Sequence, residues 1–404
     1  MAGIDLASRS SSMNDSIAEQ VDVLSRYAEL WREQAFCHPV LSWESRWPRL
    51  SAALRGLTQA QIDRLANDPS ASHQFFTALE PELYWPAPDM AGVDAVACSL
   101  SVAPYQRRDI PGRKYAQIAA FVERVRDQQL PFLEWCAGKS HLGRLLSHCF
   151  NGRAVTATEI DPVLVREARR LAERETAPLS SNQIDVMEVD VTQYLQRPCH
   201  AVALHACGDL HLRLMRLVSE YRIPAADIAP CCYHLTADPV WRPLSRVVGD
   251  TSLALTRDDL RTAVQETVTA PGYARRARAH LQSWQLGWDL LRREVTASDE
   301  WEPIPRVRVA GLDFRRYCEQ LGAQRGVIFG PAMDFSQYER AGRERLRVVS
   351  ALDLVRHQFR RTLEQVLVAD RAAWLQEQGY AVTVRVFCER ALSPRNLMIS
   401  ARLG

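Results

Sequence analysis

The sequence predicts an α/β fold with a doubly wound, mostly parallel sheet, and three observations support this. Short apolar runs of strand length alternate with segments of helical periodicity between residues 111 and 249. The first run, 132–136, leads through a loop of small residues into a helix and a second strand. Two strand-like runs near the C-terminus are joined by a short turn, so they must pair antiparallel. Strands that alternate with helices are typical of a parallel sheet, and the terminal hairpin adds an antiparallel edge.

Residues 131–161, PFLEWCAGKSHLGRLLSHCFNGRAVTATEID, have the residue types of a nucleoside-binding βαβ unit. Small residues at Ala137, Gly138 and Ser140 let backbone amides approach a ligand closely, and the helix that follows adds its positive N-terminal end. Glu159 ends the second predicted strand, about 20 residues after Gly138. A carboxylate at this place can accept hydrogen bonds from both hydroxyls of a ribose. The unit therefore predicts a nucleoside site.

The loop departs from the dinucleotide-binding pattern in a way that favours a ligand without phosphates. Cys136 and Ser140 occupy positions where glycine is usual, so the loop would hold a pyrophosphate poorly. S-adenosylmethionine is the common nucleoside ligand of this kind, and the Glu134 carboxylate would attract its sulfonium and amino-acid end. The alternative is a structural strand-to-helix turn that binds no ligand.

Three more strands are predicted, over 183–190, 201–205 and 226–230. Ligands of parallel sheets bind beyond the carboxyl ends of the strands, so polar residues that follow a strand are site candidates. Asp190 ends the third strand, where a carboxylate would hold an adenine amino group. The fourth and fifth strands lead into two polar segments, 205–209 and 231–234.

Helical patterns flank this core on both sides. The predicted ranges are a helical N-terminal domain over 1–110, a core over 111–249, a helical insertion over 250–337, and a C-terminal part over 338–404 that completes the core. That last part comprises a long helix over 341–378 and hairpin strands over 380–388 and 397–403. Thr58 and Asp161 are predicted N-caps of helices.

Composition and charge restrict the class of protein. The chain has 50 basic and 48 acidic residues, and its formal net charge of +2 neither requires nor excludes a nucleic-acid partner. The N-terminus lacks the apolar segment of a signal peptide, and no stretch approaches the ~18 apolar residues of a membrane span. The ten cysteines show no paired spacing typical of a zinc ribbon. We expect a reduced cytoplasmic protein with no membrane or DNA partner.

Cysteine and histidine residues gather after the fourth and fifth predicted strands. Zinc binding by Cys207, Cys231 and Cys232, together with His205 or His234, is one interpretation. Adjacent cysteines on an extended strand point to opposite faces, however, so they cannot bind one tetrahedral ion without a kink. A thiol activated by a neighbouring histidine is a second interpretation, and buried structural cysteines are a third. We expect no metal.

Three segments, LEWCAGKSHLGRLL, ALHACGDL and APCCYH, resemble in order and spacing the methyltransferase-domain family that includes methyltransferase-like protein 25 and its bacterial relatives. A eukaryotic tRNA 2′-O-methyltransferase is a more distant member, whose Cys-His-rich finger this sequence lacks. The resemblance covers residues 112–250 and the terminal hairpin, and it implies a seven-stranded, Rossmann-like class I methyltransferase fold that uses S-adenosylmethionine. It assigns Gly138, Lys139 and Gly143 to the cofactor loop, Glu159 and Asp190 to the nucleoside, and His205, Cys207, Gly208 and Asp209 to the segment beside the transferred methyl group. Ser140 replaces a glycine of the usual pattern.

The candidate site residues fall into two groups. The predicted cofactor site comprises Glu134, Ala137, Gly138, Lys139, Ser140, Gly143, Glu159, Asp190, His205 and Cys207. The candidates for a base that unloads the acceptor are His205 and His234, followed by Asp209 and Tyr233. A hydrogen bond that shapes the pocket is the alternative role for each of these four side chains.

These patterns predict an S-adenosylmethionine-dependent methyltransferase that acts on a macromolecule, with RNA slightly favoured over protein. Arg275, Arg276 and Arg278 lie near Trp284 and Trp288 in the insertion, and cations interleaved with aromatic rings suit RNA. An arginine face in solvent over a tryptophan core would give the same pattern. Two other functions remain open. One is a non-catalytic RNA- or protein-binding relative that keeps the cofactor, and the other is an NAD(P)-dependent oxidoreductase, against which the missing glycines and the terminal hairpin count.

Overall fold

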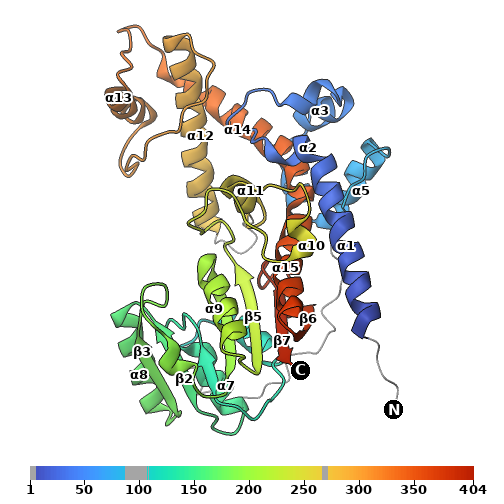
Figure 1. Ribbon diagram of the computed structural model, residues 1–404. Helices are drawn as coiled ribbons and strands as arrows, with labels where there is room; N and C mark the ends of the chain where they lie inside the picture. Colours follow the sequence, from blue (N-terminus) through green and yellow to red (C-terminus); the bar gives the residue numbers. More distant parts are fainter. Residues whose placement is uncertain (1–5, 87–106, 108, 266–271) are drawn as a thin grey trace. The chain divides into compact units, whose positions relative to one another are not determined.

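The computed structural model describes residues 6–86, 107, 109–265 and 272–404, with side chains from residue 16 onward. The chain divides into two compact units (Figure 1). We call them the sheet unit (1–26, 89–269 and 360–404) and the helical unit (27–88 and 270–359). This division differs from the predicted one, because part of the N-terminal region and part of the insertion fold together in the helical unit.

The sheet unit contains a seven-stranded mixed sheet in the order β3-β2-β1-β4-β5-β7-β6. Strands β1 to β5 pair in parallel, and β7 runs antiparallel to both β5 and β6. The strands are β1 Phe132–Glu134, β2 Val155–Glu159, β3 Leu179–Gln183, β4 His200–Cys207, β5 Ala225–Cys231, β6 Tyr380–Val386 and β7 Leu397–Leu403. The predicted Rossmann-like sheet with an antiparallel terminal hairpin is confirmed.

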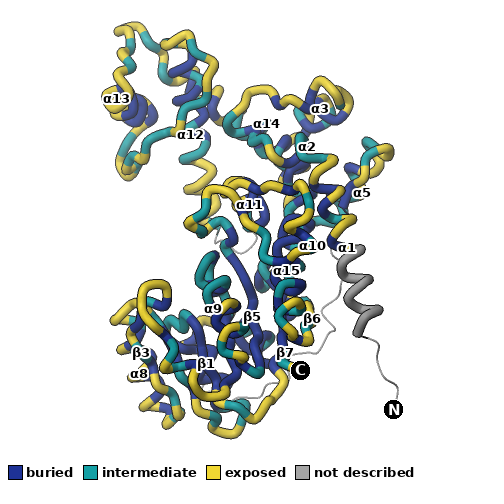
Figure 2. Tube along the Cα trace, viewed as in Figure 1, coloured by how far each residue is buried: buried dark blue, intermediate teal, exposed yellow. Residues whose placement is uncertain are grey.

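Helices pack against this sheet, and the strands at its centre are largely buried (Figure 2). The sheet unit contains α1 Leu6–Arg26, α6 Gly112–Val122, α7 His141–Cys149, α8 Pro162–Arg174, α9 Asp209–Glu220, α10 Arg246–Gly249, α11 Arg257–Thr262 and α15 Arg360–Glu377. One core cluster joins α6 and α7 to β1, β4 and the terminal hairpin through residues such as Phe121, Phe132 and Phe387. Asp161 caps α8 as predicted, since its carboxylate accepts a hydrogen bond of 2.7 Å from the Val163 amide.

Two predicted elements have different bounds in the structure. The third strand ends at Gln183 and does not reach Asp190, because the Asp185 carboxylate accepts a hydrogen bond of 2.9 Å from the Met187 amide and turns the chain out of the ladder. The predicted helix over 341–378 is two helices, which separate at Phe359. This break coincides with the boundary between the two units.

The helical unit is built from segments that are far apart in the sequence. It contains α2 Ala28–Arg32, the short 3₁₀ helix η1 Ser42–Ser45, α3 Pro48–Arg55, α4 Gln59–Asn67, α5 Pro69–Leu79, α12 Gly272–Thr296, α13 Phe314–Arg325 and α14 Phe335–Gln358. Thr58 caps α4 as predicted, in a reciprocal pair of hydrogen bonds with Gln61. Trp284 and Trp288 lie in a buried core cluster with side chains of α13 and α14.

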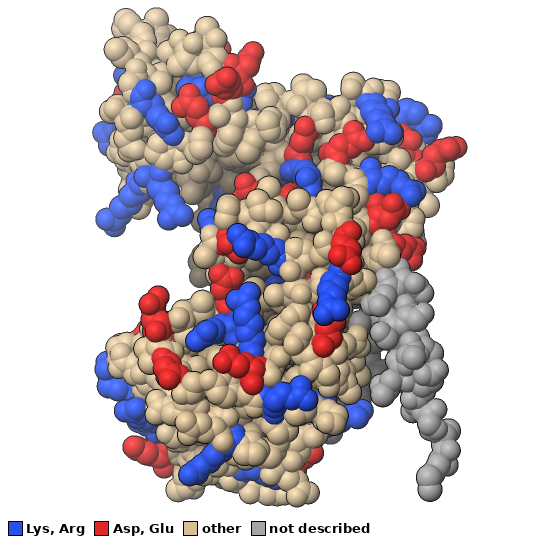
Figure 3. All heavy atoms as spheres, viewed as in Figure 1, with Lys and Arg blue, Asp and Glu red and all other residues tan. Residues whose placement is uncertain are grey.

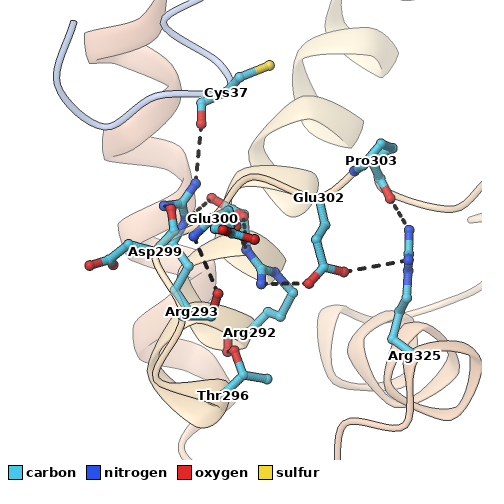
Figure 4. Close-up of polar contacts among 11 residues, drawn as sticks. Cys37, Arg292, Arg293, Thr296, Asp299, Glu300, Glu302, Pro303 and Arg325 are labelled. Carbon is cyan, nitrogen blue, oxygen red and sulfur yellow. Dashed lines mark hydrogen bonds and ion pairs between the residues drawn. The ribbon is translucent and has the colours of Figure 1, made fainter. Parts of the chain in front are cut away.

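Two buried arginines of α12 hold this helix to the segment after α2 and to the segment that follows α12 (Figure 4). Arg293 donates a hydrogen bond of 2.7 Å to Asp289 and one of 3.2 Å to the carbonyl oxygen of Cys37. Arg292 pairs with Asp289 at 3.2 Å and with Glu302 at 3.1 Å. A buried charge without such partners is strongly destabilising, so these contacts fix the chain after α2 and the segment after α12.

The surface has mixed charge. On the face that Figure 3 shows, basic and acidic side chains are interspersed, in keeping with the small net charge. Among the described residues, none of the helices combines the length and the apolar character that a bilayer crossing needs.

A substitution at Gly208 tests how tightly the backbone at the start of α9 packs against Leu235. The φ of Gly208 is +53°, and an added Cβ would lie 1.8 Å from the carbonyl oxygen of Leu235. Gly152 has a φ of +70° but open space around the same position, so it is a control for a positive φ without the clash. We expect Gly208→Ala to lower the free energy of unfolding of the full chain by at least ~2 kcal/mol more than Gly152→Ala does, in urea denaturation. Equal effects of the two substitutions would contradict this packing.

Candidate functional site

The loop after β1 is fixed to β2 by hydrogen bonds. The Ala137 amide donates to the carbonyl oxygen of Thr158 at 2.9 Å, and the Gly138 amide donates to Glu159 Oε2 at 2.8 Å. The other carboxylate oxygen of Glu159 accepts from the Ile160 and Asp161 amides at 3.0 and 3.1 Å. The structure therefore brings together the loop and the carboxylate that the sequence assigns to a nucleoside.

Glu134 lies beneath this loop and determines its shape. It is 3% exposed and accepts hydrogen bonds from the Ser140 hydroxyl and, at 3.1 Å, from the Gly143 amide. Burial raises the pKa of Glu134 to about 7, although both hydrogen bonds lower it. Gly143 must be glycine, because a Cβ would lie 2.4 Å from Glu134 Oε2. Ser140 is fully buried with a φ of +50°, whereas Lys139 is exposed.

The structure separates two carboxylates near the end of β3. Asp190 is exposed, lies seven residues beyond Gln183, and accepts a hydrogen bond of 2.9 Å from the Thr192 amide. Asp185 lies two residues beyond the strand, and its charge acts on Cys136 in the loop after β1. The sequence analysis missed Asp185, which lies inside the strand predicted over 183–190. Aspartate favours turns in which its carboxylate accepts from the amide two residues later, so an aspartate within a predicted strand was the available signal.

Apolar side chains are exposed at the same edge of the sheet. Ile160 follows β2 and is 58% exposed, and Met187 and Val189 follow β3 at 45% and 47% exposure. The Ile184 amide donates to the carbonyl oxygen of Glu159 at 2.8 Å, so the two strand ends are adjacent. Exposed apolar side chains beside hydrogen-bonding carboxylates fit the flat face and polar edge of a purine nucleoside.

His205 lies in an irregular segment at the end of β4. The β4–β5 register shifts between Leu204 and Cys207, and His205 has a φ of +68°. Its Nε2 atom forms a short hydrogen bond with the side-chain amide of Gln117 on α6. Burial lowers the pKa of His205 to about 4, so its imidazole is neutral at pH 7.

The segment after β5 turns sharply back toward α9. Cys232 has a φ of +47°, and the Leu235 amide donates to the carbonyl oxygen of Cys232 at 2.9 Å. Asp209 stabilises this turn, since its carboxylate accepts a hydrogen bond of 2.8 Å from the Ala237 amide. The left-handed conformation of Cys232 supplies the kink that two adjacent cysteines need to share one ion, so the geometric argument against a shared cysteine site does not apply to this backbone.

Tyr233 and His234 have different surroundings. Tyr233 is 2% exposed, and the Arg371 guanidinium lies 5.2 Å from the centre of its ring. Burial raises the pKa of Tyr233 well above its usual range. His234 is half-buried, and its Nδ1 atom has no hydrogen-bond partner within the part of the chain that the structure describes.

Three thiols meet at this edge. The Sγ atoms of Cys207, Cys231 and Cys232 all lie within 4.8 Å of one another. Hydrogen bonds with Cys207 and Cys231 lower the pKa of Cys232, and hydrogen bonds with Cys207 and Cys232 raise the pKa of Cys231. Cys136 lies apart from this group in the loop after β1, and burial raises the pKa of its thiol to about 12.

The buried carboxyl of Glu134 predicts a pH dependence of stability. Its folded pKa of about 7 lies above its ordinary value of 4.5, so its contribution to stability is complete below pH 4.5 and is lost as the pH rises to 7. We expect the free energy of unfolding of the wild type, relative to Glu134→Gln, to fall by roughly 3 kcal/mol over this interval in urea denaturation. Any effect of the substitution on the free energy of unfolding that does not depend on pH is the same at both ends of this interval, so it does not contribute to the change. A difference that stays constant from pH 4.5 to 7 would contradict the raised pKa.

Comparison with known proteins finds one matching family model and similar solved structures. Residues 113–239 match the family model of a methyltransferase domain. One similar solved structure is the tRNA (uracil-54, C5)-methyltransferase of Pyrococcus abyssi in complex with S-adenosyl-L-homocysteine, with 18% identity, a TM-score of 0.24, and coverage of 29% of each chain. Another is coclaurine N-methyltransferase bound to N-methylheliamine and S-adenosylhomocysteine, with 10% identity, a TM-score of 0.24, and coverage of 54% of this chain and 57% of that one.

Both alignments cover less than two thirds of the solved chains. The matched residues 113–239 include nearly all of α6, the strands β1 to β5 and the polar segments at the carboxyl ends of these strands. The family match and the order of the seven strands agree. Residues 113–239 of the sheet unit therefore match a methyltransferase domain, and the seven-stranded sheet that contains them has a Rossmann-like methyltransferase fold.

Proposed function

We propose that this protein is an S-adenosylmethionine-dependent methyltransferase with a macromolecular acceptor, and that RNA is favoured over protein. The observation that carries the cofactor assignment is the contact between Gly138 and Glu159. It joins the loop that precedes α7 to a carboxylate at the end of β2, within the residues that match a methyltransferase domain.

The described residues fit the proposed cofactor. An added Cβ at Gly138 would meet nothing within 4 Å, so a ligand can approach this backbone closely. Glu159 would accept hydrogen bonds from the ribose hydroxyls, and Ile160 and Met187 offer exposed apolar surface for the adenine. Asp185 or Asp190 would accept from the adenine amino group. S-adenosylmethionine, when bound, supplies a methyl group already activated by its sulfonium.

The role of Glu134 differs from direct attraction of the sulfonium. Its carboxyl accepts hydrogen bonds from Ser140 and Gly143, so we propose that it holds the loop in its ligand-binding conformation. Ala137 and Lys139 would contribute to the loop through its backbone, since Ala137 is anchored to Thr158 and the Lys139 side chain lies in solvent.

For methyl transfer, the chain's own residues must align the acceptor and accept its proton. His205 and His234 remain the proposed bases. Asp209 and Tyr233 fit this role less well, because Asp209 stabilises the turn after β5 and the Tyr233 ring is buried against Arg371. Cys207 and His205 would line the methyl site from the end of β4.

RNA recognition is proposed for the exposed arginines near the start of α12. Arg275, Arg276 and Arg278 are all exposed, and guanidinium groups suit phosphates. Trp284 and Trp288 are 5% and 2% exposed, so they form core and are not available to stack on unpaired bases. The proposal for RNA therefore rests on charge and predicts binding with a strong dependence on salt.

Replacing Glu159 tests the cofactor assignment. We expect Glu159→Ala to weaken S-adenosylhomocysteine binding by ~1.5–3 kcal/mol in calorimetry, because the substitution removes charge-assisted hydrogen bonds. Glu173→Ala removes an exposed carboxylate of the neighbouring helix α8 and should leave the affinity unchanged. Unchanged affinity in Glu159→Ala, in protein shown to be folded by circular dichroism, would overturn the assignment.

Replacing the three arginines tests the acceptor. The triple variant of Arg275, Arg276 and Arg278 to Gln should bind RNA more weakly. The slope of log K against log salt should fall by about 2, because each phosphate that an arginine neutralises accounts for ~0.7 of the slope. S-adenosylhomocysteine binding should not change.

The matched control removes the same charge from elsewhere in the helical unit, by changing Arg306, Arg308 and Arg316 to Gln. These side chains are also exposed, so a purely nonspecific charge effect would weaken RNA binding equally in both variants. RNA binding that is undetectable at low salt, or unaffected by the first triple change, would place a protein acceptor ahead of RNA.

A further inference from the structure

We propose that Cys207, Cys231 and Cys232 bind a zinc ion through three thiolates at the carboxyl edge of the sheet. Their Sγ atoms lie within 4.8 Å of one another, and those of Cys207 and Cys231 are 3.5 Å apart. In a tetrahedral site with Zn–S bonds of about 2.3 Å, two sulfur ligands are separated by about 3.8 Å. The thiols are therefore already close to the spacing that one zinc ion requires.

The backbone fixes these three residues independently of any ion. Cys207 and Cys231 are partners in the β4–β5 ladder, on the far side of the register shift. The Gly208 amide donates to the carbonyl oxygen of Cys231 at 3.0 Å, and the Leu235 amide donates to that of Cys232 at 2.9 Å. Strained backbone that is held by its surroundings is common at functional sites, and such a preformed site lowers the cost of ordering metal ligands.

The left-handed conformation of Cys232 is what makes three ligands possible. On a regular strand, the side chains of Cys231 and Cys232 would point to opposite faces of the sheet. With a φ of +47° at Cys232, the chain turns at the end of β5 and both sulfur atoms lie near Cys207. A buried cysteine that only fills space requires no such turn.

The chemistry of the group selects a soft cation. All three ligand atoms are sulfur, which favours zinc over magnesium or calcium, whose preferred ligands are oxygen atoms. Three thiolates and Zn²⁺ leave a net charge of −1, and Arg395 is a cation whose charge acts on Cys207 and Cys232. Three protein ligands leave a fourth position for water or another ligand, as in catalytic zinc sites.

The test measures metal in the full chain, purified under reducing conditions without a polyhistidine tag or chelator. We expect about one zinc per chain by elemental analysis, and only a small fraction of this in Cys207→Ala, Cys231→Ala and Cys232→Ala. Cys199→Ala is the matched control, because Cys199 is also buried and precedes the opposite end of β4. Its zinc content should equal that of the wild type.

Cobalt reconstitution keeps the test decisive if a variant fails to fold. The wild type loaded with Co²⁺ should show thiolate-to-cobalt charge-transfer absorption and the visible bands of tetrahedral cobalt. Three results would overturn the proposal: wild-type protein with neither zinc nor cobalt–thiolate absorption, absorption that persists in the folded triple variant, or iron found in place of zinc. A disulfide between Cys207 and Cys231 in freshly purified protein would also overturn it.

The metal site and the proposed methyltransferase activity can fail separately. S-adenosylhomocysteine binding, measured on the same preparations, tests the cofactor site without reference to the thiols. Binding without zinc would overturn only the metal site, and zinc without binding would overturn only the proposed function.

Discussion

The end of the β4–β5 ladder is the constraint on which the candidate site depends. The two strands pair regularly from His200 and Ala225 to Leu204 and Ala229, and the register then shifts before Cys207 pairs with Cys231. This shift brings His205 into contact with Gln117 of α6, and it places Cys207 beside the turn that follows β5. Residues from two strands and two loops therefore meet at one edge because a single ladder ends irregularly.

The irregular end is supported by a buried arginine of α15. Arg371 donates a hydrogen bond of 2.8 Å to His211 Nε2, which leaves His211 Nδ1 to donate to the carbonyl oxygen of Ala206 at 3.1 Å. Burial, and then the charge of Arg371, lower the pKa of His211 well below its usual range, so this imidazole is neutral. The same guanidinium lies against the Tyr233 ring. A helix outside the matched range 113–239 thus contacts both segments that border the site.

The sequence was sufficient to predict two helix caps and the adjacent strand ends near Gly138 and Glu159, because these depend on residues that are close in the sequence or on adjacent strands. Thr58 and Asp161 were predicted as N-caps because a capping side chain bonds to amides two or three residues away. Gly138 and Glu159 were assigned from the sequence to one nucleoside-binding unit, and they are in contact because adjacent parallel strands end at the same edge of the sheet.

Other features depend on contacts that residue types do not specify. The turn at Asp185 ended β3 before Asp190, and the turn between Cys232 and Leu235 set a backbone angle that a regular strand would not have. The periodicity of α12 placed Trp284 and Trp288 on one face, but only the packing of α13 and α14 shows that this face is covered. The assembly of the helical unit from residues 27–88 and 270–359 has no local signature.

The central claim, that this domain transfers methyl groups to a macromolecule, is tested most directly with radiolabelled S-adenosylmethionine. The protein is incubated with the labelled cofactor and a cell lysate, which is then separated into RNA, protein and small molecules. The account predicts label in the RNA fraction that ribonuclease releases. Label that enters only small molecules, or no fraction at all although S-adenosylhomocysteine binds, would contradict it.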